Sequence, residues 1–525
     1  MRNRYSRILF LSILILSFFS CQDKPSENKK AVSEKLNLQN KEKPNVIFII
    51  ADDLNCDIGA YGNSIIQTPH IDELSRHGVL FENAHNQYPL CGPSRASFMT
   101  GMYTDQTKMT RNNMYIRNSI PDVITIGQRF RQQGYQSIRI GKIFHYDNPS
   151  AIGTSGTDDP HTWDQTVNPY GRDKKEEYKI NTLSPRKYGG TLSWLSAEGK
   201  DEEYTDGIVA SEAVRYLDEF SKTGESFFLA VGFYRPHTPF VAPQKYFELY
   251  DRSSISIPKS NNDYLKSIPE PAAKSIRAKK NQINLEEELA KEIKEAYYAS
   301  ISFIDAQIGR ILNKLKESGL NENTIVIFTS DHGYHLGEHG HWQKQTLFEN
   351  STRVPLIISV PGGRNAPARS NSPVELIDLY PTIMDLTKIE IPNHVVGKSL
   401  EPIIKNQSVK VRKNALTRWR NGYSIKTERY RLTQWGKNGI IGYELYDHQS
   451  DREELTNLAS QSAYKVIFDS LKTVLKDRIA NAQLKPNGLG RQYENINELQ
   501  KAPNITYGDL YDSQGKRIYL KPTDE

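Results

Sequence analysis

Two pairs of residues that could bind a metal ion follow strongly apolar stretches of this sequence. Asp52 and Asp53 follow the run from Val46 to Ala51, and Asp331 and His332 follow the run "TIVIFT" after one serine. Ligands of open parallel sheets bind beyond the carboxyl ends of the strands, so both pairs are expected at one site. Converging carboxylates repel one another unless a cation compensates them. We therefore predict a divalent-metal site; the alternative is that each pair lies in a helix cap or a solvated turn.

The ligand types indicate which metal this site would bind. Oxygen ligands favour Ca²⁺ or Mg²⁺, whereas the imidazole of His332 is a softer ligand than either ion prefers. The residue types alone leave Ca²⁺ and Mg²⁺ both open.

Cys91 could be a nucleophile because of the sequence that follows it. It lies in "PLCGPSRASFMTG", where Pro93 is typical of a first helical turn, so a helix is expected to begin near that residue. A group at a helix start experiences the positive end of the helix dipole, and Arg95 adds a cation. These features favour a thiol of lowered pKa that attacks an anionic substrate; a buried structural cysteine beside a proline turn is the alternative.

The first residues predict export. Arginines precede an apolar run from Ile8 to Phe19, which ends at Ser20 and Cys21 and is too short to span a membrane. The position of Cys21 is similar to a bacterial lipoprotein cleavage site. We therefore predict a signal peptide over 1–21, a lipid anchor at Cys21, and a flexible tether over 22–42. The protein would be held at the outer membrane, in the periplasm or at the cell surface; plain secretion is the alternative.

The cysteines give little support for a disulfide. The chain has three of them, so at most one bridge can form. If Cys21 carries lipid, only Cys56 and Cys91 could pair, and Cys56 is more typical of a small packed residue.

Length and composition set the general class. The chain has 525 residues, of which 37% are hydrophobic, so it can bury a large core, and one large domain with a smaller one is expected. A net charge of +6 is small for this length and does not indicate a nucleic-acid partner.

The chemistry-bearing residues must be positioned by alternating strands and helices. Apolar runs at 46–51, 227–233 and 324–329 are typical of buried parallel strands, and amphipathic helical stretches lie between them. This pattern predicts an α/β, doubly wound sheet domain over 43–389. Polar insertions at about 148–203 and 253–290 are expected to cover the active-site end. Residues 390–525 are expected to form a smaller α+β subdomain, with a short antiparallel sheet and a helix.

The segment around Cys91 resembles the signature of the type I sulfatases, C-x-P-S-R-x-x-x-x-T-G. The signature is matched at Cys91, Pro93, Ser94, Arg95, Thr100 and Gly101. "PNVIFIIADD" and "FTSDHGYHLGEHG" resemble further marks of the family, in the same order. Several segments, such as "IGKIFH", are most similar to the iduronate-2-sulfatase subgroup. The resemblance implies an alkaline-phosphatase-like fold.

The resemblance also implies a modified cysteine. In this family a maturation enzyme oxidises the cysteine to formylglycine, whose hydrated aldehyde is a geminal diol. One diol oxygen attacks sulfur and displaces the sugar alcohol. The other hydroxyl then loses its proton, so that the carbonyl reforms and sulfate leaves. The Ca²⁺ ligands implied are Asp52, Asp53, Asp331, His332 and the modified Cys91, with Arg95 holding the diol.

Three further segments imply contacts to the substrate. "GKIFHYDNP" resembles an element whose Lys142 and His145 would contact the sulfate and the bridging oxygen. "FFLAVGFYRPHTPF" would supply His237 to protonate the leaving oxygen, and "LGEHGHWQKQTLFE" would supply Lys344 as the second sulfate-binding lysine. Taken singly, each could be a surface charge or a packed histidine.

The predicted function is hydrolysis of sulfate esters in a sulfated polysaccharide or its oligosaccharides. Similarity to iduronate-2-sulfatase favours a uronic-acid-containing glycan such as ulvan or a glycosaminoglycan. One alternative is a phosphate or phosphonate monoester hydrolase of the same superfamily, and another is a non-catalytic glycan-binding lipoprotein.

Overall fold

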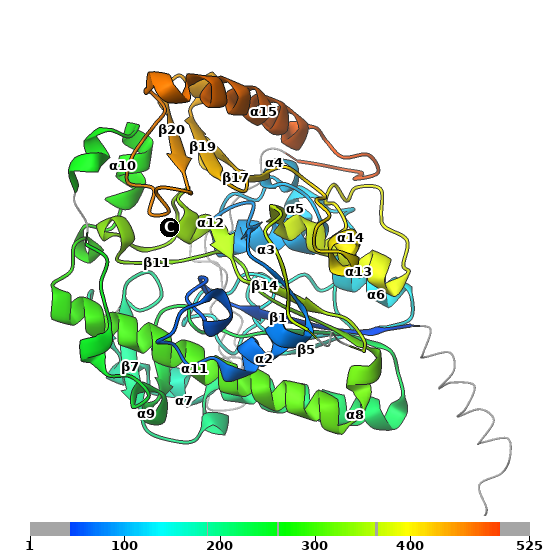
Figure 1. The fold of residues 1–525 in the computed structure, drawn as a ribbon. Helices are drawn as coiled ribbons and strands as arrows, with labels where there is room; N and C mark the ends of the chain where they lie inside the picture. Colours follow the sequence, from blue (N-terminus) through cyan, green and yellow to red (C-terminus); the bar gives the residue numbers. More distant parts are fainter. Residues whose placement is uncertain (1–42, 186, 260–261, 363–365, 494–525) are drawn as a thin grey trace, which may run out of the picture. The chain divides into compact units, whose positions relative to one another are not determined.

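The computed structural model describes residues 43–493, apart from 186, 260–261 and 363–365 (Figure 1). The predicted signal peptide, Cys21 and the tether lie outside the described residues, as do residues 494–525. Among the described residues, no helix is both long and apolar enough to cross a membrane.

A central eight-stranded sheet organises the described chain, in the order β15-β2-β14-β10-β1-β8-β4-β5. Strands β10, β1, β8, β4 and β5 run parallel to one another, whereas β14 is antiparallel to both of its neighbours, β10 and β2. The bounds are β15 Ala368–Ser370, β2 Val79–Phe81, β14 Leu356–Ser359, β10 Thr324–Ser330, β1 Asn45–Ala51, β8 Phe227–Gly232, β4 Gln136–Gly141 and β5 Gln165–Val167.

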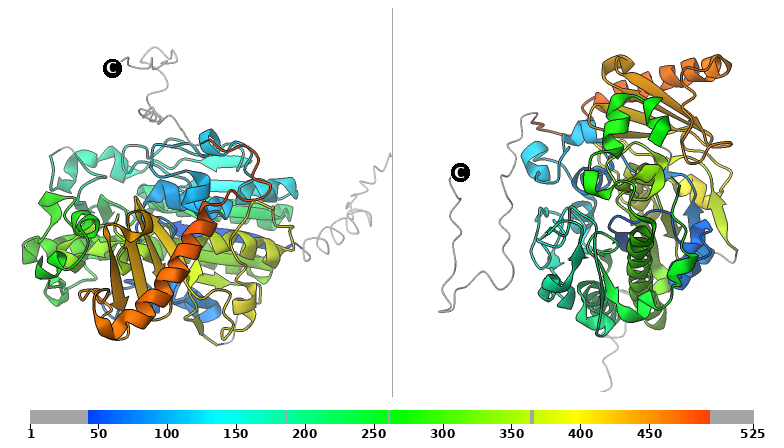
Figure 2. Two further views of the ribbon diagram at one scale, coloured as in Figure 1. Left: turned by 90° about the horizontal axis from the view of Figure 1, so that it is seen from above. Right: turned by 90° about the vertical axis from the view of Figure 1, so that its left-hand side faces the viewer.

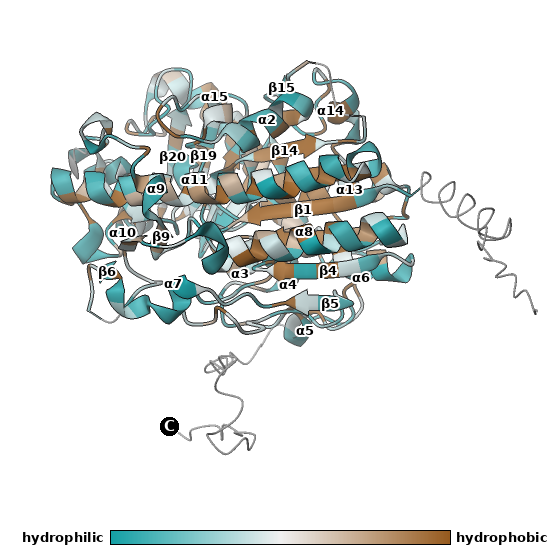
Figure 3. Ribbon diagram, turned by 90° about the horizontal axis from the view of Figure 1, so that it is seen from below, coloured by the Kyte–Doolittle hydropathy of each residue, from teal (hydrophilic) through white to brown (hydrophobic). Residues whose placement is uncertain are grey.

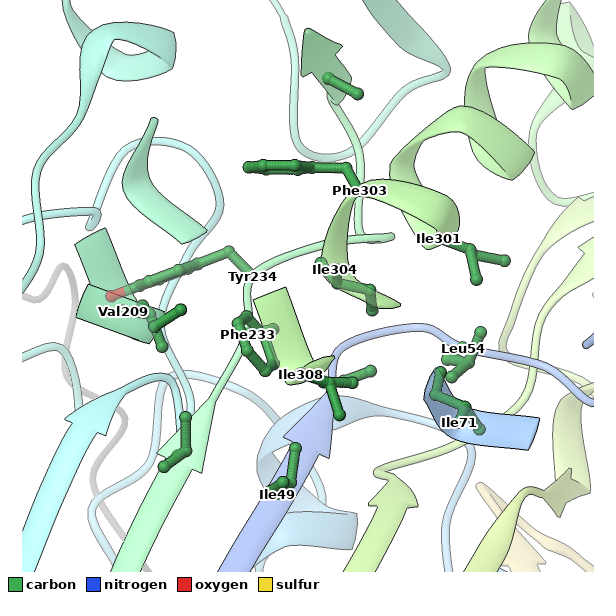
Figure 4. Close-up of a cluster of buried hydrophobic side chains, with 14 of the residues drawn as sticks. Ile49, Leu54, Ile71, Val209, Phe233, Tyr234, Ile301, Phe303, Ile304 and Ile308 are labelled. Carbon is green, nitrogen blue, oxygen red and sulfur yellow. The ribbon is translucent and has the colours of Figure 1, made fainter. Parts of the chain in front are cut away.

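Strand β1 is buried on both faces because its apolar side chains alternate between two hydrophobic clusters. Ile47 and Ile49 belong to the cluster beneath α8 (Thr205–Thr223) and α11 (Glu287–Glu317). Phe48 and Ile50 belong to the cluster beneath α3 (Cys91–Thr100), α6 (Ile126–Gln132) and α13 (Leu379–Thr387). Figure 4 shows Ile49 beside Ile308 of α11, and Figure 3 shows β1 in the hydrophobic colour, between α8 and α11 in that view. Helices on both faces of a mostly parallel sheet confirm the predicted fold class.

The helices of this domain have the following bounds: α2 Pro69–His77, α3 Cys91–Thr100, α6 Ile126–Gln132, α8 Thr205–Thr223, α11 Glu287–Glu317 and α13 Leu379–Thr387.

The C-terminal part forms an antiparallel sheet followed by a helix, as predicted (Figures 1 and 2). Its elements are β17 Ala415–Trp419, β18 Gly422–Lys426, β19 Tyr430–Trp435, β20 Gly442–Asp447 and α15 Lys465–Gln483. Trp419 and Trp435 of this sheet share a hydrophobic cluster with Leu90, next to Cys91, and with Ile268 and Ile276 of the second insertion. The C-terminal sheet therefore supports both the nucleophile segment and that insertion.

The two insertions contain short regular elements. The first supplies β5, α7 Arg172–Lys175, β6 Asn181–Thr182 and β7 Ser193–Ala197, and the second supplies α10 Glu270–Ile276. Strand β7 pairs with β6 and with β9 Phe240–Pro243, which follows the loop that carries His237.

Candidate active site

The register of the central sheet brings the predicted metal-binding pairs to one edge. Ala51 of β1 lies opposite Ser330 of β10 in a parallel ladder, so Asp52 and Asp331 leave neighbouring strands at nearly the same level. Asp53 has a φ of 64°, and its backbone N–H donates to Asp331 Oδ1 at 3.2 Å. The left-handed turn at Asp53 thus places three carboxylates together at the carboxyl edge of the sheet.

Arg95 connects the ends of these strands through hydrogen bonds to their carboxylates. It is fully buried on α3, and it donates to Asp52 Oδ1 at 2.9 Å and to Asp331 Oδ2 at 2.8 Å. Its Nη1 atom donates to the carbonyl oxygens of Lys142, at 2.6 Å, and Ile143, at 2.9 Å. A planar guanidinium with several donors suits this bracing position, because it holds two carboxylates and a third strand end at once.

Cys91 is the first residue of α3, two residues earlier than the predicted helix start. Its Sγ atom lies 3.2 Å from His332 Nε2, 3.4 Å from Lys344 Nζ and 3.9 Å from Asp53 Oδ1. The structure therefore brings the predicted nucleophile to the predicted metal ligands, although they lie far apart in the sequence.

The prediction of a lowered thiol pKa is wrong. Burial raises the pKa of the Cys91 thiol well above its usual range, and the positive charge of Lys344 does not offset this. A helix start alone does not stabilise a thiolate when the group lies in a buried site that also contains carboxylates. The geometry does not favour an unmodified thiolate nucleophile.

The donor set around His332 fits a bound cation. His332 Nδ1 lies 3.0 Å from the carbonyl oxygen of Gly333, which can only accept, so in the neutral ring Nδ1 carries the hydrogen. The lone pair of Nε2 then faces Asp53 Oδ1 at 3.3 Å and Asp331 Oδ2 at 3.7 Å. The carboxylates already accept from Lys344 and Arg95, and a divalent metal could take all three of these converging acceptor atoms as ligands. Asp52, Asp53, Asp331, His332 and Cys91 all belong to clusters whose atoms are close enough for metal binding.

Two buried lysines complete the charge balance. Lys142 Nζ donates to Asp52 Oδ2 at 2.6 Å, and Lys344 Nζ donates to Asp53 Oδ1 at 2.5 Å. The structure thus places both predicted sulfate-binding lysines beside the carboxylates, with Lys142 at Asp52 and Lys344 at Asp53.

The two predicted histidines line one cavity of about 550 Å³, together with Lys344. His237 Nδ1 lies 2.6 Å from the carbonyl oxygen of Thr238, and its Nε2 lies 3.8 Å from Asp53 Oδ2. Burial, and then the charge of Lys344, hold the pKa of His237 well below its usual range. His237 is therefore neutral, with its Nε2 lone pair on the side of Asp53.

His145 occupies a different position from His237. Its Nε2 lies 2.9 Å from Asp147 Oδ1, and its buried Nδ1 has no hydrogen-bond partner among the described residues. Burial lowers the pKa of His145 to about 4. The structure thus brings His145 to the cavity wall, where its Nε2 contacts Asp147 and none of the predicted metal ligands.

Residues that the sequence analysis missed also hold the site. Asn148 lines the cavity and donates through Nδ2 to Asp52 Oδ2 at 3.2 Å. Tyr297 of α11 donates its hydroxyl hydrogen to the carbonyl oxygen of Asp53 at 2.8 Å. Asn148 lies within "GKIFHYDNP", so that segment carried a signal, whereas nothing around Tyr297 distinguishes it from an ordinary core residue.

An α/β sheet that collects carboxylates, lysines and a cysteine at one edge fits a hydrolase of anionic esters, and this is the class that the fold and the site define. A model of the sulfatase family matches residues 44–389, and a model described as the C-terminal part of N-sulphoglucosamine sulphohydrolase matches residues 337–481. The chain belongs to the sulfatase family and is a sulfuric ester hydrolase.

Individual relatives agree with this assignment. A sulfatase from Formosa agariphila is 35% identical over 498 residues, which cover 90% of this chain and 92% of that protein. Iduronate 2-sulfatase from Mus musculus is 31% identical over 428 residues, which cover 74% of each chain. The structure of a phosphonate monoester hydrolase from Agrobacterium radiobacter superposes with a TM-score of 0.71 at 22% identity, covering 84% of this chain and 96% of that chain, and so shares the fold.

Proposed function

We propose that this sulfatase removes sulfate from a uronic-acid-containing glycan, such as ulvan or a glycosaminoglycan, after Cys91 has been converted to formylglycine. The observation that carries the proposal is the position of Cys91 at the start of α3, within 4 Å of His332, Lys344 and Asp53. A buried thiol of raised pKa is a poor nucleophile, whereas a diol at the same position would supply an attacking oxygen and an internal route for sulfate release.

The metal site supports Ca²⁺ as the cofactor. Asp52, Asp53, Asp331, His332 and the modified Cys91 would hold the ion. When bound, Ca²⁺ would neutralise the carboxylates, attract the sulfate oxygens and favour deprotonation of the diol. Arg95 keeps Asp52 and Asp331 in place for this purpose and would hold the diol.

The remaining residues act on the sulfate and on the leaving group. Lys142 and Lys344, which contact the carboxylates in this structure, would donate to sulfate oxygens and stabilise the charge that develops on them. His237 would give a proton from Nε2 to the departing oxygen, because an anion bound beside the ring favours its protonated form. His145, on the wall of the same cavity, would contact the bridging oxygen.

The substrate proposal rests on similarity to iduronate 2-sulfatase and on the cavity. Both insertions contribute to its wall, through residues such as Tyr188 and Lys279, so these insertions would contact the sugar. A glycan substrate also fits the proposed export with a lipid anchor at Cys21. Labelled palmitate should enter the wild type and not Cys21→Ala.

The test of the catalytic proposal combines mass spectrometry with kinetics. The peptide that contains Cys91 should lose its sulfur and gain a carbonyl group, and the matured protein should release sulfate from para-nitrophenyl sulfate and from sulfated uronate oligosaccharides. An active enzyme that retains an unmodified thiol at Cys91 would overturn the formylglycine mechanism.

A second candidate function is favoured by the fold shared with the phosphonate monoester hydrolase. The kcat/KM values for aryl sulfate and aryl phosphonate esters separate the two candidates. A strong preference for the phosphonate would replace the proposed substrate class while leaving the nucleophile unchanged.

A further inference from the structure

Lys279 of the second insertion lines the same cavity as His237 and Lys344. Its Nζ atom donates to the carbonyl oxygen of Gly190 at 2.6 Å and also to Gln343 Oε1. An ammonium group has three donors, so one remains for a ligand in the cavity. Within the described part of the chain, no carboxylate forms an ion pair with Lys279.

The other lysines of this region differ from Lys279 in their partners. Lys174 lines the cavity but forms an ion pair with Glu177 at 2.5 Å. Lys142 and Lys344 each contact a carboxylate among the predicted metal ligands. Lys279 is therefore a cavity-lining cation that is hydrogen-bonded to neutral oxygens alone, an arrangement that leaves its charge available to an anion.

A buried chain of amides fixes this lysine in place. Gln343 Nε2 donates to Gln282 Oε1 at 2.7 Å, and Gln282 Nε2 donates to Thr191 Oγ1 at 3.0 Å. Because the nitrogen of Gln343 is occupied, its Oε1 must face Lys279. Thr191 and Gly190 belong to the first insertion, whereas Gln282 and Lys279 belong to the second. The two insertions thus meet at Lys279 and hold it before any substrate binds.

The electrostatic environment also favours a bound anion. Burial, and then the positive charge of Lys344, lower the pKa of Lys279 to about 8, while Asp53 opposes this shift. A negative group beside Lys279 would compensate both the cost of burying its charge and the repulsion between the two lysines.

We propose that Lys279 binds a second anionic group of the substrate, separate from the sulfate that is cleaved. This group is a carboxylate or a further sulfate, on the sugar that carries the scissile ester or on its neighbour. Lys279 is then a specificity-determining residue, and the inference rests on the sulfatase function proposed above.

The test compares two matched pairs of sulfate esters. The carboxylate pair is methylumbelliferyl iduronide 2-sulfate and its uncharged methyl ester; the sulfate pair is glucosamine N,6-disulfate and N-acetylglucosamine 6-sulfate. For each pair, the ratio of kcat/KM for the more anionic member to that for the less anionic member gives the selectivity. Lys279→Gln keeps a hydrogen-bonding side chain but removes the charge, and it should lower one of the two ratios by roughly tenfold or more.

Two further variants keep the result interpretable. Lys279→Arg retains the charge and should keep the ratio within roughly threefold of wild type. Lys280→Gln removes an exposed neighbouring lysine that does not line the cavity, so both ratios should stay unchanged. Thermal unfolding of each variant identifies loss of fold. If neither pair is turned over, inhibition constants of the same compounds against para-nitrophenyl sulfate hydrolysis give the same ratios.

The outcomes separate the two proposals. The pair whose ratio falls identifies the second group as a carboxylate or a sulfate. If neither ratio changes in Lys279→Gln, the inference is overturned while the sulfatase function stands. If matured wild type hydrolyses no sulfate ester, the proposed function fails, and this inference fails with it.

Discussion

The two sides of the substrate cavity are built in different ways. At the strand ends, charged groups are fully buried and each contacts a group of opposite charge, as in the contacts of Arg95 with Asp52 and Asp331. On the insertion side, Lys174 is paired with Glu177, but neutral amide and carbonyl oxygens are the hydrogen-bond partners of Lys279. The first arrangement suits chemistry, which requires compensated charges in fixed positions. The second suits recognition, because an unpaired cation gains most when a ligand supplies its counterion.

The largest expected effect is at Cys91. Cys91→Ala should lose at least about 10⁴-fold in kcat/KM on every sulfate ester, because it removes the proposed nucleophile. Cys56→Ala is the matched control, since Cys56 is the other described cysteine and forms no disulfide. If purified Cys91→Ala keeps activity within tenfold of wild type, then neither Cys91 nor the strand ends beside it carry out the reaction.

Removal of the metal should be the next largest effect. Chelation should lower activity by roughly 10³-fold or more, because the carboxylates and the sulfate lose their common cation. The unfolding free energy should rise by roughly 3 kcal/mol when Ca²⁺ is restored at about 100 times its dissociation constant. Calorimetry and sulfate release with and without Ca²⁺ measure both. An Asp331→Asn variant whose stability still responds fully to Ca²⁺ would place the ion elsewhere.

His237→Ala tests how the leaving group departs. For sugar sulfates the loss should be roughly 10²- to 10³-fold, because an alkoxide needs a proton as it leaves. For para-nitrophenyl sulfate the loss should be under roughly tenfold, since the phenolate leaves without help. Equal losses on both esters would show that His237 only shapes the cavity.

The sequence allowed the residues of the strand-end side to be predicted. For the insertion side it predicted only that the two insertions cover the active-site end, which the cavity lining confirms, and not which of their residues act there. The strand before Asp52 is buried on both faces, so it appears as a continuous apolar run, and a parallel sheet requires such runs to end at one edge. Cys91 and Arg95 lie four residues apart on one helix, and that spacing can be recognised locally. The sequence could not indicate, however, that the Cys91 thiol is buried beside three carboxylates, so the direction of its pKa shift was predicted wrongly.

No comparable local pattern marks the insertion side. Gly190, Gln282 and Gln343 meet at Lys279 only through the folding of three separate segments. Strand β5, which extends the central sheet from within the first insertion, is short and has exposed polar residues, so it gives no apolar signal. The start of α11 at Glu287 likewise falls inside the range predicted as an insertion.

Gln282→Leu tests whether the amide chain positions Lys279. The variant breaks the bond to Gln343 Nε2 and should lower the selectivity for the more anionic ester about fivefold, which corresponds to roughly 1 kcal/mol for one buried hydrogen bond. The less anionic ester of the pair should be affected much less. Gln244→Leu, at an exposed glutamine of α9 Gln244–Phe247, is the control. A uniform loss on both esters would indicate a structural role only.

The smallest effect is a pH dependence of the same selectivity. The pKa of Lys279 is lowered to about 8, so its positive charge is present below that pH and is lost as the pH rises through it. Carboxylate and sulfate groups stay ionised throughout this range. Because Lys344 and Asp53, the charged groups that act on Lys279, influence both esters of a pair, their effects largely cancel in the ratio.

The kcat/KM ratio should therefore fall about twofold between pH 7 and pH 8 in the wild type. It should stay constant in Lys279→Arg, whose guanidinium remains charged. A wild-type ratio that is constant or rises with pH would mean that the insertion side recognises the sugar without using the charge of Lys279.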